Sequence, residues 1–248
     1  MPPLILAIDT AFSRCLAAVF DPADGGRLLA AREPEIGKGH AERLTRVIDD
    51  VLGEAGATYR DLSRVVVTTG PGSFTGIRVG VAAARGLALA LDIPAVGIST
   101  LQALAHRAIN GAINGRSETG DDMASAPILA ALDARRGEIY AALFSAGGSV
   151  LGDPVALQPA ALDAMLNDAG STGPVRLVGS GAEIAAANLA GRSIAIVSAA
   201  DRIDPETLAR LGSNAAVGKP PSPLYLRSAD AKPSSAASLR AGHVESIP

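Results

Sequence analysis

The spacing of apolar and polar residues predicts a chain in which strands and helices alternate. Apolar runs separated by short polar or glycine-rich breaks predict five strands in the first half, at residues 4–10, 14–20, 27–32, 64–69 and 94–98. Apolar residues that recur every three or four positions predict helices at about 40–55, 75–91 and 100–109. The predicted order of elements is therefore βββαβαβα.

The second half of the chain echoes the first. Residues 110–126 are rich in Gly, Asn, Ser and Asp and predict a linker or loop. Beyond them, Ile128–Asp133 resembles Ile5–Asp9 with one residue inserted. So short a match also arises by chance between apolar hairpins, but the later elements repeat the outline. They are predicted as a turn at 147–148, helices at 158–169, after 181 and at 205–211, and strands at 175–178 and 193–197.

These patterns divide the chain into three parts. Residues 1–108 are predicted as a first lobe, and residues 109–227 as a smaller, degenerate second lobe. Residues 228–248 are polar and rich in small side chains, which predicts a flexible tail. Because 48% of the 248 residues are apolar, the chain has ample material for a core.

The helix predicted at 75–91 has almost no polar face. Its only charges, Arg78 and Arg85, are seven residues apart and lie on one side. A helix that is apolar all round is usually buried all round. Packing on the chain's own sheet would cover one face, and we expect another subunit to cover the second.

The preceding helix is amphipathic, with apolar residues at the spacing i, i+3, i+4, i+7 and i+8 from Leu44 to Leu52. Alone, this pattern indicates a helix that faces the core. Beside a wholly apolar helix, it would also fit half of an intermolecular helix bundle.

Charge and composition narrow the classes of function. The formal net charge is −3, with 22 basic and 25 acidic residues and no long basic run, which argues against a protein that grips nucleic acid unaided. Aromatic residues make up only 3% and Trp is absent, so platforms for base stacking are scarce. Cys15 is the only cysteine, so intramolecular disulfides are excluded.

Neither a signal peptide nor a membrane span is expected. The first residues lack a basic region and reach Asp9 too soon for a signal peptide. The longest apolar region, 76–98, is interrupted by charged residues and Pro94. The chain is therefore expected to be cytoplasmic, without a membrane partner.

A glycine-rich turn offers the clearest candidate chemistry. The segment 70–76 lies between a strand and a helix, where several backbone N–H groups could converge on an anion. A glycine turn at such a junction more often only ends one element and begins the next. The glycines alone favour that structural role.

The sequence resembles a known family over residues 4–227. The resemblance is carried by the segments ILAIDTA (5–11), GPGSFTGIRVG (70–80), ALDARRGEIY (131–140) and PLYLR (223–227). Together they resemble the TsaB (YeaZ) family. This resemblance implies an α/β fold of two RNase H-like βββαβαβα halves, as in the actin, Hsp70 and sugar-kinase ATPase superfamily.

The resemblance also implies a function. The family is understood as the noncatalytic dimerisation subunit of the bacterial machinery that makes threonylcarbamoyladenosine at adenosine 37 of tRNAs reading ANN codons. Its sister TsaD has the same fold and transfers the threonylcarbamoyl group, and the ATPase TsaE joins the pair. ATP and metal are expected on these partners, with none bound by this chain alone, and tRNA is expected to bind mainly through the complex.

The resemblance places the partner interface on the two helices at 40–55 and 75–91, as half of a four-helix bundle. The expected interface residues are Leu44, Val47, Ile48, Val51, Gly76, Gly80, Val81 and Ala84. The same surface would form homodimers when the partner is absent. Gly80→Leu is expected to block the heterodimer and leave the monomer folded.

Departures from the sister argue against catalysis. Thr100 and Leu104 stand where TsaD has two metal-binding histidines, so no metal is expected. Long side chains at Arg135 and Arg136, beside Asp133, replace a compact phosphate loop. A nucleotide site, alone or shared with the sister, would use Asp9, Thr10, Gly70, Gly72, Gly179 and Gly181.

Two other classes of function stay open. An autonomous ATP-dependent kinase of this fold would use Asp9 and the glycine-rich turn. A peptidase, the old label of the wider family, would need a zinc site or an activated nucleophile. Neither Cys15 nor Ser73 has an evident base in the sequence.

Overall fold

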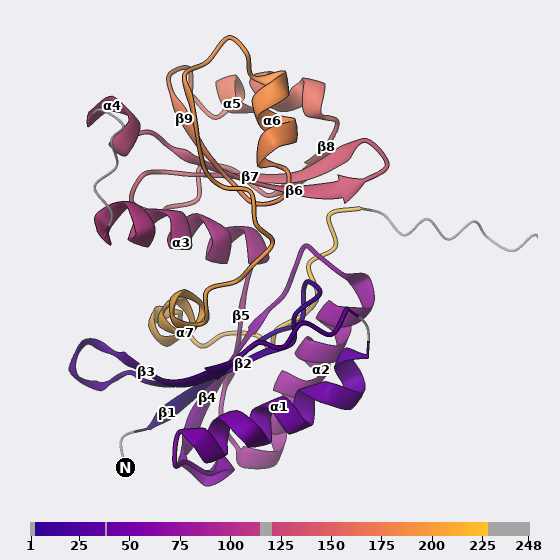
Figure 1. Cartoon of the computed structure of the whole chain (residues 1–248), viewed down its shortest axis with the longest axis vertical. Helices are drawn as coiled ribbons and strands as arrows, with labels where there is room; N and C mark the ends of the chain where they lie inside the picture. The colour runs from indigo at the N-terminus through magenta and orange to yellow at the C-terminus, as the bar shows by residue number, and fades with distance from the viewer. Residues whose placement is uncertain (1–2, 38, 115–120, 228–248) are drawn as a thin grey trace, which may run out of the picture.

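The computed structural model describes residues 3–37, 39–114 and 121–227. Two lobes, each built on one five-stranded sheet, are stacked along the long axis of the molecule, and two helices lie between the sheets (Figure 1). The predicted tail, 228–248, lies outside the described residues.

The first sheet has the strand order β3-β2-β1-β4-β5. β1 pairs antiparallel with β2 and parallel with β4, so Ile8 lies between Ala17 and Val67. The strands span Leu4–Asp9 (β1), Leu16–Asp21 (β2), Arg27–Arg32 (β3), Leu62–Thr68 (β4) and Ala95–Ile98 (β5). All six residues of β1 are buried because both faces of the sheet are covered.

The second sheet repeats this arrangement, with the order β10-β9-β6-β7-β8. β6 pairs antiparallel with β7 and parallel with β9, as β1 does with β2 and β4. The strands span Ile128–Arg135 (β6), Glu138–Phe144 (β7), Val155–Leu157 (β8), Val175–Val178 (β9) and Ile194–Ser198 (β10). The predicted duplication of an RNase H-like α/β unit is confirmed.

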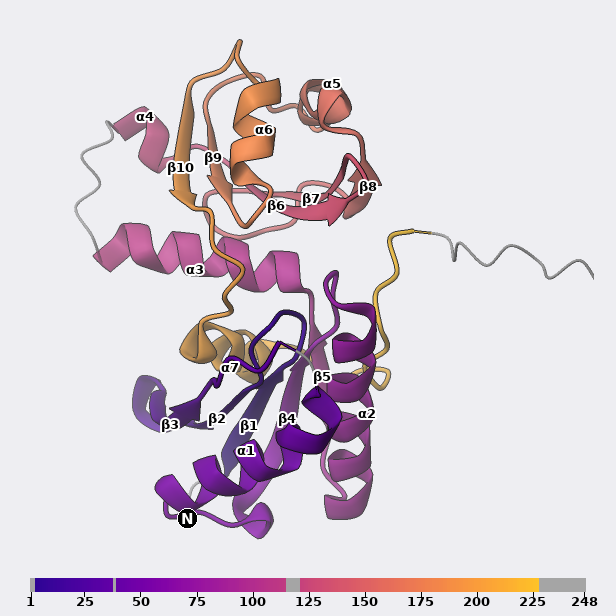
Figure 2. The ribbon, with the colours of Figure 1, turned by 45° about the vertical axis from the view of Figure 1, so that its right-hand side comes forward.

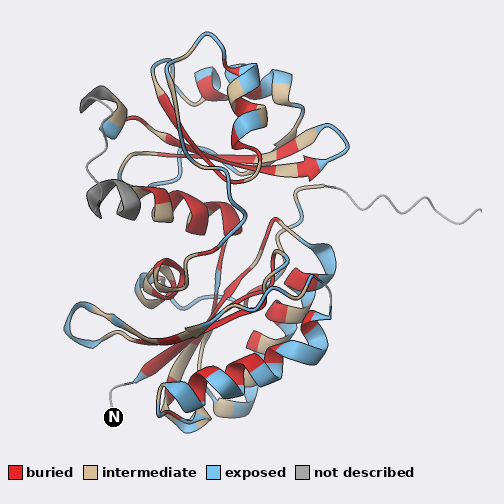
Figure 3. Cartoon of the chain, in the orientation of Figure 1, coloured by how far each residue is buried: buried red, intermediate tan, exposed pale blue. Residues whose placement is uncertain are grey.

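The helices form three layers with the two sheets. The outer layers hold α1 (His40–Glu54) and α2 (Phe74–Leu91) on the first sheet, and α5 (Leu162–Asp168) and α6 (Ala182–Asn188) on the second. Figure 3 shows that these helices are buried toward the sheets and exposed on the opposite side. Three short 3₁₀ turns, Ala23–Gly25, Tyr59–Asp61 and Pro159–Ala161, complete these layers.

The inner layer holds α3 (Thr100–Asn114) and α7 (Pro205–Asn214), and each packs on the sheet of the other lobe (Figures 1 and 2). α3 lies against β6 and β7, whereas α7 crosses β1, β2 and β4. The approach of α7 is so close that a Cβ on Gly212 would lie 2.2 Å from a methyl carbon of Val66. The division predicted between residues 108 and 109 falls inside α3.

The predicted loop at 110–126 is corrected in part. α3 continues to Asn114, and a short helix, α4, spans Asp121–Ala124.

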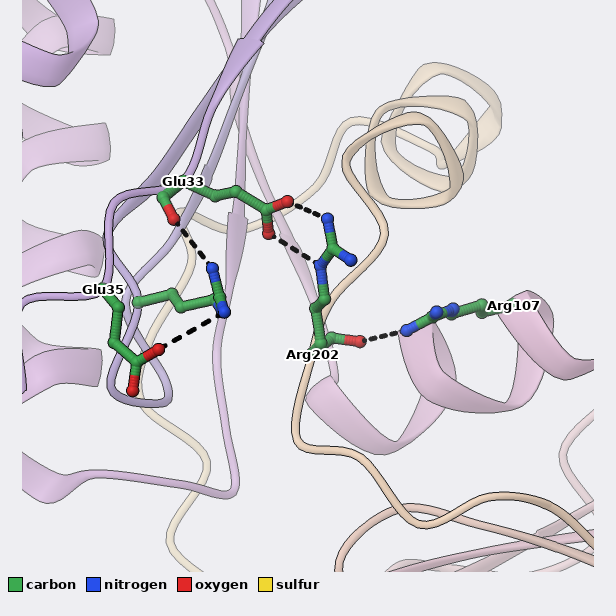
Figure 4. Close-up of polar contacts among 5 residues, drawn as sticks. Glu33, Glu35, Arg107 and Arg202 are labelled. Carbon is green, nitrogen blue, oxygen red and sulfur yellow. Dashed lines mark hydrogen bonds and ion pairs between the residues drawn. The ribbon is translucent and has the colours of Figure 1, made fainter.

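An ion-pair network joins the inner layer to the first lobe (Figure 4). The carboxylate of Glu33, just after β3, pairs with Arg202 in the segment that leads to α7. The carbonyl oxygen of Arg202 accepts a hydrogen bond of 3.1 Å from Arg107 on α3. Arg14 donates to the carbonyl oxygen of Glu33 at 3.2 Å and pairs with Glu35 at 3.3 Å. The network therefore ties four separate segments together at the junction of the lobes.

After α7 the chain crosses from the first lobe to the second. The amide of Leu224 donates to the carbonyl oxygen of Thr69 at 2.8 Å. Three residues later, Arg227 pairs with Glu138 on β7 and donates to the carbonyl oxygen of Arg135. The described chain ends there.

Candidate functional site

One side of α2 packs on the chain's own sheet. Ser73 caps the helix by accepting a hydrogen bond from the amide of Gly76. A Cβ on Gly76 would lie 2.0 Å from the carbonyl oxygen of Thr10, and a Cβ on Gly80 would lie 2.3 Å from the hydroxyl of Thr10. The glycine strip therefore brings α2 close to the end of β1.

The opposite side of α2 is exposed. Ala82, Arg85, Gly86, Leu89 and Ala90 follow the spacing i, i+3, i+4, i+7 and i+8, and all are exposed. We call these five residues the outer face of α2. Leu89 is 86% exposed, which is unusual for a large apolar side chain.

The length and mean hydropathy of α2, 1.4, would also suffice to cross a membrane. About 33% of the helix is buried inside the protein. The close approach to β1, together with Arg78 and Arg85, fits a helix of a globular lobe better than a lipid-spanning one.

The structure places the predicted interface residues in the chain's own core. On α1, the side chains of Leu44, Val47, Ile48 and Val51 are at most 6% exposed and pack with strands of the first sheet. On α2, Gly76, Gly80, Val81 and Ala84 are buried in the same layer. The predicted spacing correctly located a buried stripe on each helix, but that stripe faces inward.

The glycine-rich turn is packed against the hairpin that follows β1. The amide of Ser73 donates to the carbonyl oxygen of Ala11 at 2.7 Å, and the hydroxyl of Thr10 donates to the carbonyl oxygen of Gly76 at 2.7 Å. A Cβ on Gly72 would lie 2.5 Å from the oxygen of Ala11. These glycines therefore serve close backbone packing, as their structural interpretation predicted.

Asp9 and Thr10, the predicted phosphate residues, are 2% and 0% exposed. One oxygen of Asp9 accepts hydrogen bonds from the Thr68 hydroxyl at 2.5 Å and the Ala11 amide at 3.0 Å. Burial raises the pKa of Asp9 above its ordinary value, while the hydrogen bonds from Thr68 and Ala11 oppose that rise. The carboxylate is thus almost fully shielded from solvent.

The predicted glycines of the second lobe are also used for packing. A Cβ on Gly179 would lie 2.3 Å from the carbonyl oxygen of Ala131, and the amide of Gly181 donates to that oxygen at 2.9 Å. These two glycines therefore pack on the backbone of β6, while Gly72 and Ser180 line one cleft between the lobes.

A cleft of about 470 Å³ does lie between the lobes. Its lining includes Ser73 from the glycine turn, and Asp133, Ser180 and Asp201 from the second lobe. The carboxylate of Asp133 already accepts hydrogen bonds from the amide and guanidinium of Arg135, at 2.7 and 3.3 Å. The lining thus holds two acidic residues, Asp133 and Asp201, and a basic one, Arg135.

Comparisons with known proteins identify the family. Residues 33–209 match the family described as TsaD: tRNA N6-adenosine threonylcarbamoyltransferase. An uncharacterized protein of Mycobacterium tuberculosis is 34% identical over 234 residues, which cover 92% of this chain and 94% of that protein. The tRNA threonylcarbamoyladenosine biosynthesis protein TsaB of Escherichia coli is 37% identical over 138 residues.

The chain belongs to the TsaB/YeaZ family. Its match to E. coli TsaB covers 55% of this chain and 52% of that protein, so the chain spans about half the length of the curated TsaB relatives that it matches. The crystal structure of YeaZ from Pseudomonas aeruginosa agrees over 90% of this chain and 100% of the other, with a TM-score of 0.66 and 26% identity.

Histidines in this TsaB-family chain do not form a metal centre in the part that the structure describes. Among those residues, no group of three or more His, Cys, Asp or Glu side chains is placed to hold a metal ion. The side chains of Thr100 and Leu104 are buried. His106 is half-buried with Nε2 3.3 Å from the carbonyl oxygen of Gly148, and burial lowers its pKa. His243 lies outside the described residues.

The position of Arg85 in the sequence already indicates which side of α2 is exposed. Arg85 marks the exposed side of α2, and the small or apolar residues at one helical turn from it, Ala82 and Leu89, form the surface beside it. The arginine thus indicates which side of the helix meets solvent, a signal that the apolar spacing alone does not supply.

Asp9 gives a testable pH dependence. Because its folded pKa is raised, the native state retains the proton to higher pH than the unfolded state, so this group lowers stability as pH rises from the unfolded value through the folded one. Asp9→Asn removes that titration. The free energy of unfolding of the variant relative to the parent should therefore increase between acidic and neutral pH, by about 1.4 kcal/mol for each tenfold difference in proton affinity between the folded and unfolded states. Urea unfolding across this range measures it, and parallel pH profiles would refute the assignment.

Proposed function

We propose that this chain is a noncatalytic dimerisation subunit that binds and activates a TsaD-type threonylcarbamoyltransferase acting on adenosine 37 of tRNAs that read ANN codons. The observation that carries the proposal is the outer face of α2, a regular stripe of small and apolar side chains that the chain itself leaves uncovered.

The surface chemistry of the two outer helices supports this choice. The exposed side of α1 carries charged residues, including Arg43, Arg46 and Asp49, whereas the outer face of α2 has a single charge at Arg85. Small residues at Ala82 and Gly86 allow another helix to approach closely, and Leu89 provides an apolar anchor. A partner helix with complementary apolar residues would bury this stripe.

A role in tRNA threonylcarbamoyladenosine biosynthesis follows the function for which the TsaB relatives are named. We assign ATP and metal to the partner subunits, including a TsaE-type ATPase, and we place the assembly in the cytoplasm. tRNA would meet mainly the complex. Without its partner, the chain would pair with a second copy through the same stripe.

The inaccessibility of the predicted phosphate groups supports a noncatalytic role. Asp9 and Thr10 are buried, and the cleft between the lobes is lined by Arg135 as well as by Asp133 and Asp201. An autonomous kinase would need these groups to open toward ATP. A peptidase would need an activated nucleophile, but burial raises the pKa of the Cys15 thiol to about 11.

Reconstitution tests the proposal. The purified chain is mixed with a TsaD-type subunit and a TsaE-type ATPase, and threonylcarbamoyl transfer to tRNA is measured with each protein omitted in turn. We expect transfer only when this chain is present, and no ATP hydrolysis by this chain alone. The kinase alternative would instead give ATP turnover by the isolated chain, lost in Asp9→Asn.

A further inference from the structure

The chain has seven aromatic residues, four Phe and three Tyr, and three of these seven meet around one surface cavity. Phe74 at the start of α2, Tyr140 on β7 and Tyr225 in the C-terminal segment line a cavity of about 310 Å³. The guanidinium groups of Arg78 and Arg227 complete its polar lining. We call these five residues the aromatic pocket.

The arginines of the aromatic pocket are stacked on its rings. The guanidinium carbon of Arg78 lies 3.7 Å from the centre of the Phe74 ring and 5.6 Å from that of Tyr225. Its Nε donates to the Tyr225 hydroxyl at 2.8 Å, and the two rings are 5.6 Å apart. Arg227 lies 5.6 Å from the centre of the Tyr140 ring. The pocket thus contains three arginine–aromatic contacts, two of them made by Arg78.

Holding the C-terminal segment in place explains only part of this arrangement. The bond from Arg78 to Tyr225 and the ion pair from Arg227 to Glu138 do fix that segment to both lobes. However, Phe74 remains 56% exposed and Tyr225 50% exposed, beside a cavity large enough for a planar ring. Exposed ring faces beside cations are the chemistry that recognises nucleic-acid bases.

We propose that the aromatic pocket binds an unpaired nucleotide of an RNA strand. Its base would stack on the ring and guanidinium faces, and its backbone phosphate would lie near Arg78 or Arg227. This inference rests on the proposed function, which brings tRNA to the assembly, and it adds a direct RNA contact by this chain.

The polar groups favour a nucleotide within a strand over a free nucleoside triphosphate. Arg227 already pairs with Glu138, and the backbone amides of Ser73 and Gly76 at the start of α2 are engaged within the protein. No acidic or histidine cluster for a divalent cation lies among the described residues. Such a site can balance the single negative charge of a phosphate within a strand better than it can balance the several charges of a polyphosphate.

The aromatic pocket lies around the start of α2, and the outer face begins at Ala82, one helical turn beyond Arg78. Phe74 and Leu89 are fifteen residues apart, or about 22 Å along the axis. A partner on the outer face and an RNA strand at the pocket therefore use different side chains, so both can bind together.

Fluorescence anisotropy with two labelled RNAs tests the proposal. One probe is a hairpin with an unpaired loop, and the other is a duplex of the same stem. Both are titrated with the full chain, alone and assembled with the TsaD-type partner. We expect tighter binding of the hairpin in at least one of these settings. Phe74→Leu and Tyr225→Leu, which remove a ring, should each weaken hairpin binding by about fivefold or more.

Two controls separate base stacking from a structural role. Tyr225→Phe keeps the ring but loses the hydroxyl that bonds Arg78, so it should bind the hairpin nearly as well as the parent. Arg85→Ala removes a charge from the same helix outside the pocket, and it should have a smaller effect than either ring deletion.

Three results would overturn the proposal: equal affinity for hairpin and duplex, unchanged binding by both leucine variants, or loss of binding in Tyr225→Phe equal to that in Tyr225→Leu. Displacement of the hairpin by free AMP would instead assign the pocket to a mononucleotide. The reconstituted transfer assay reports on the proposed function separately, since a chain that supports assembly but shows no ring-dependent RNA binding refutes only this inference.

Discussion

Replacing Leu89 by glutamate is expected to abolish assembly with a TsaD-type partner and leave the chain folded. Leu89 is 86% exposed, so the substitution costs little in the free chain. In a complex, the new carboxylate would be desolvated in an apolar contact, a cost that pairing with Arg85 one helical turn away offsets only in part. Affinity should fall at least about thirtyfold, and threonylcarbamoyl transfer should fall with it.

Val150→Glu provides the matched control for this substitution. Val150 is also an exposed apolar residue, 55% exposed, but it lies in the second lobe beyond β7. Size-exclusion chromatography and calorimetric titration of both variants measure the difference. Normal assembly by Leu89→Glu, or equal loss in Val150→Glu, would place the partner on another surface.

Gly80→Leu is expected to destabilise the chain itself. A Cβ at this position would lie 2.3 Å from the Thr10 hydroxyl and 3.4 Å from a methyl carbon of Val67, so a leucine has no space between α2 and the sheet. Such overpacking typically costs about 1–3 kcal/mol and occasionally more. We expect the thermal midpoint to fall by about 5 °C or more. The structure thus corrects the expectation that this variant blocks only the heterodimer.

Gly86→Leu is the control on the same helix. Nothing lies within 4 Å of the position that its Cβ would occupy, and leucine has a higher helix propensity than glycine. Its thermal midpoint should equal or exceed that of the parent. If both leucine variants had the same thermal midpoint, close packing on Thr10 would not be the reason that residue 80 is a glycine.

Local sequence patterns predicted most elements of the fold, but not β8, and the fold class came with the family resemblance. Alternation and apolar runs located all five strands of the first lobe, and the echo of Ile5–Asp9 in Ile128–Asp133 correctly indicated the duplication. These patterns could not predict that α3 and α7 each pack on the sheet of the other lobe. An apolar stripe shows that a helix packs on something, but it does not show which sheet covers the stripe.

The candidate site was predictable only in outline. The sequence shows that α2 is apolar on two sides. It does not show that the glycines face the sheet, because this depends on their contact with Thr10, a residue 66 positions before Gly76. The aromatic pocket was missed because Phe74, Tyr140 and Tyr225 come from distant parts of the chain. A low aromatic content indicated few stacking platforms, but it could not show that the few would gather in one place.

The packing of α3 and α7, each on the sheet of the other lobe, has a consequence for how the molecule unfolds. The layer between the sheets joins side chains of both lobes, including Val66, Leu104, Leu132 and Leu208, in one core cluster. Neither lobe can lose its sheet without exposing a helix that the other supplies. We therefore expect a single cooperative unfolding transition, in which the calorimetric and van't Hoff enthalpies agree, and not two successive melts of independent halves.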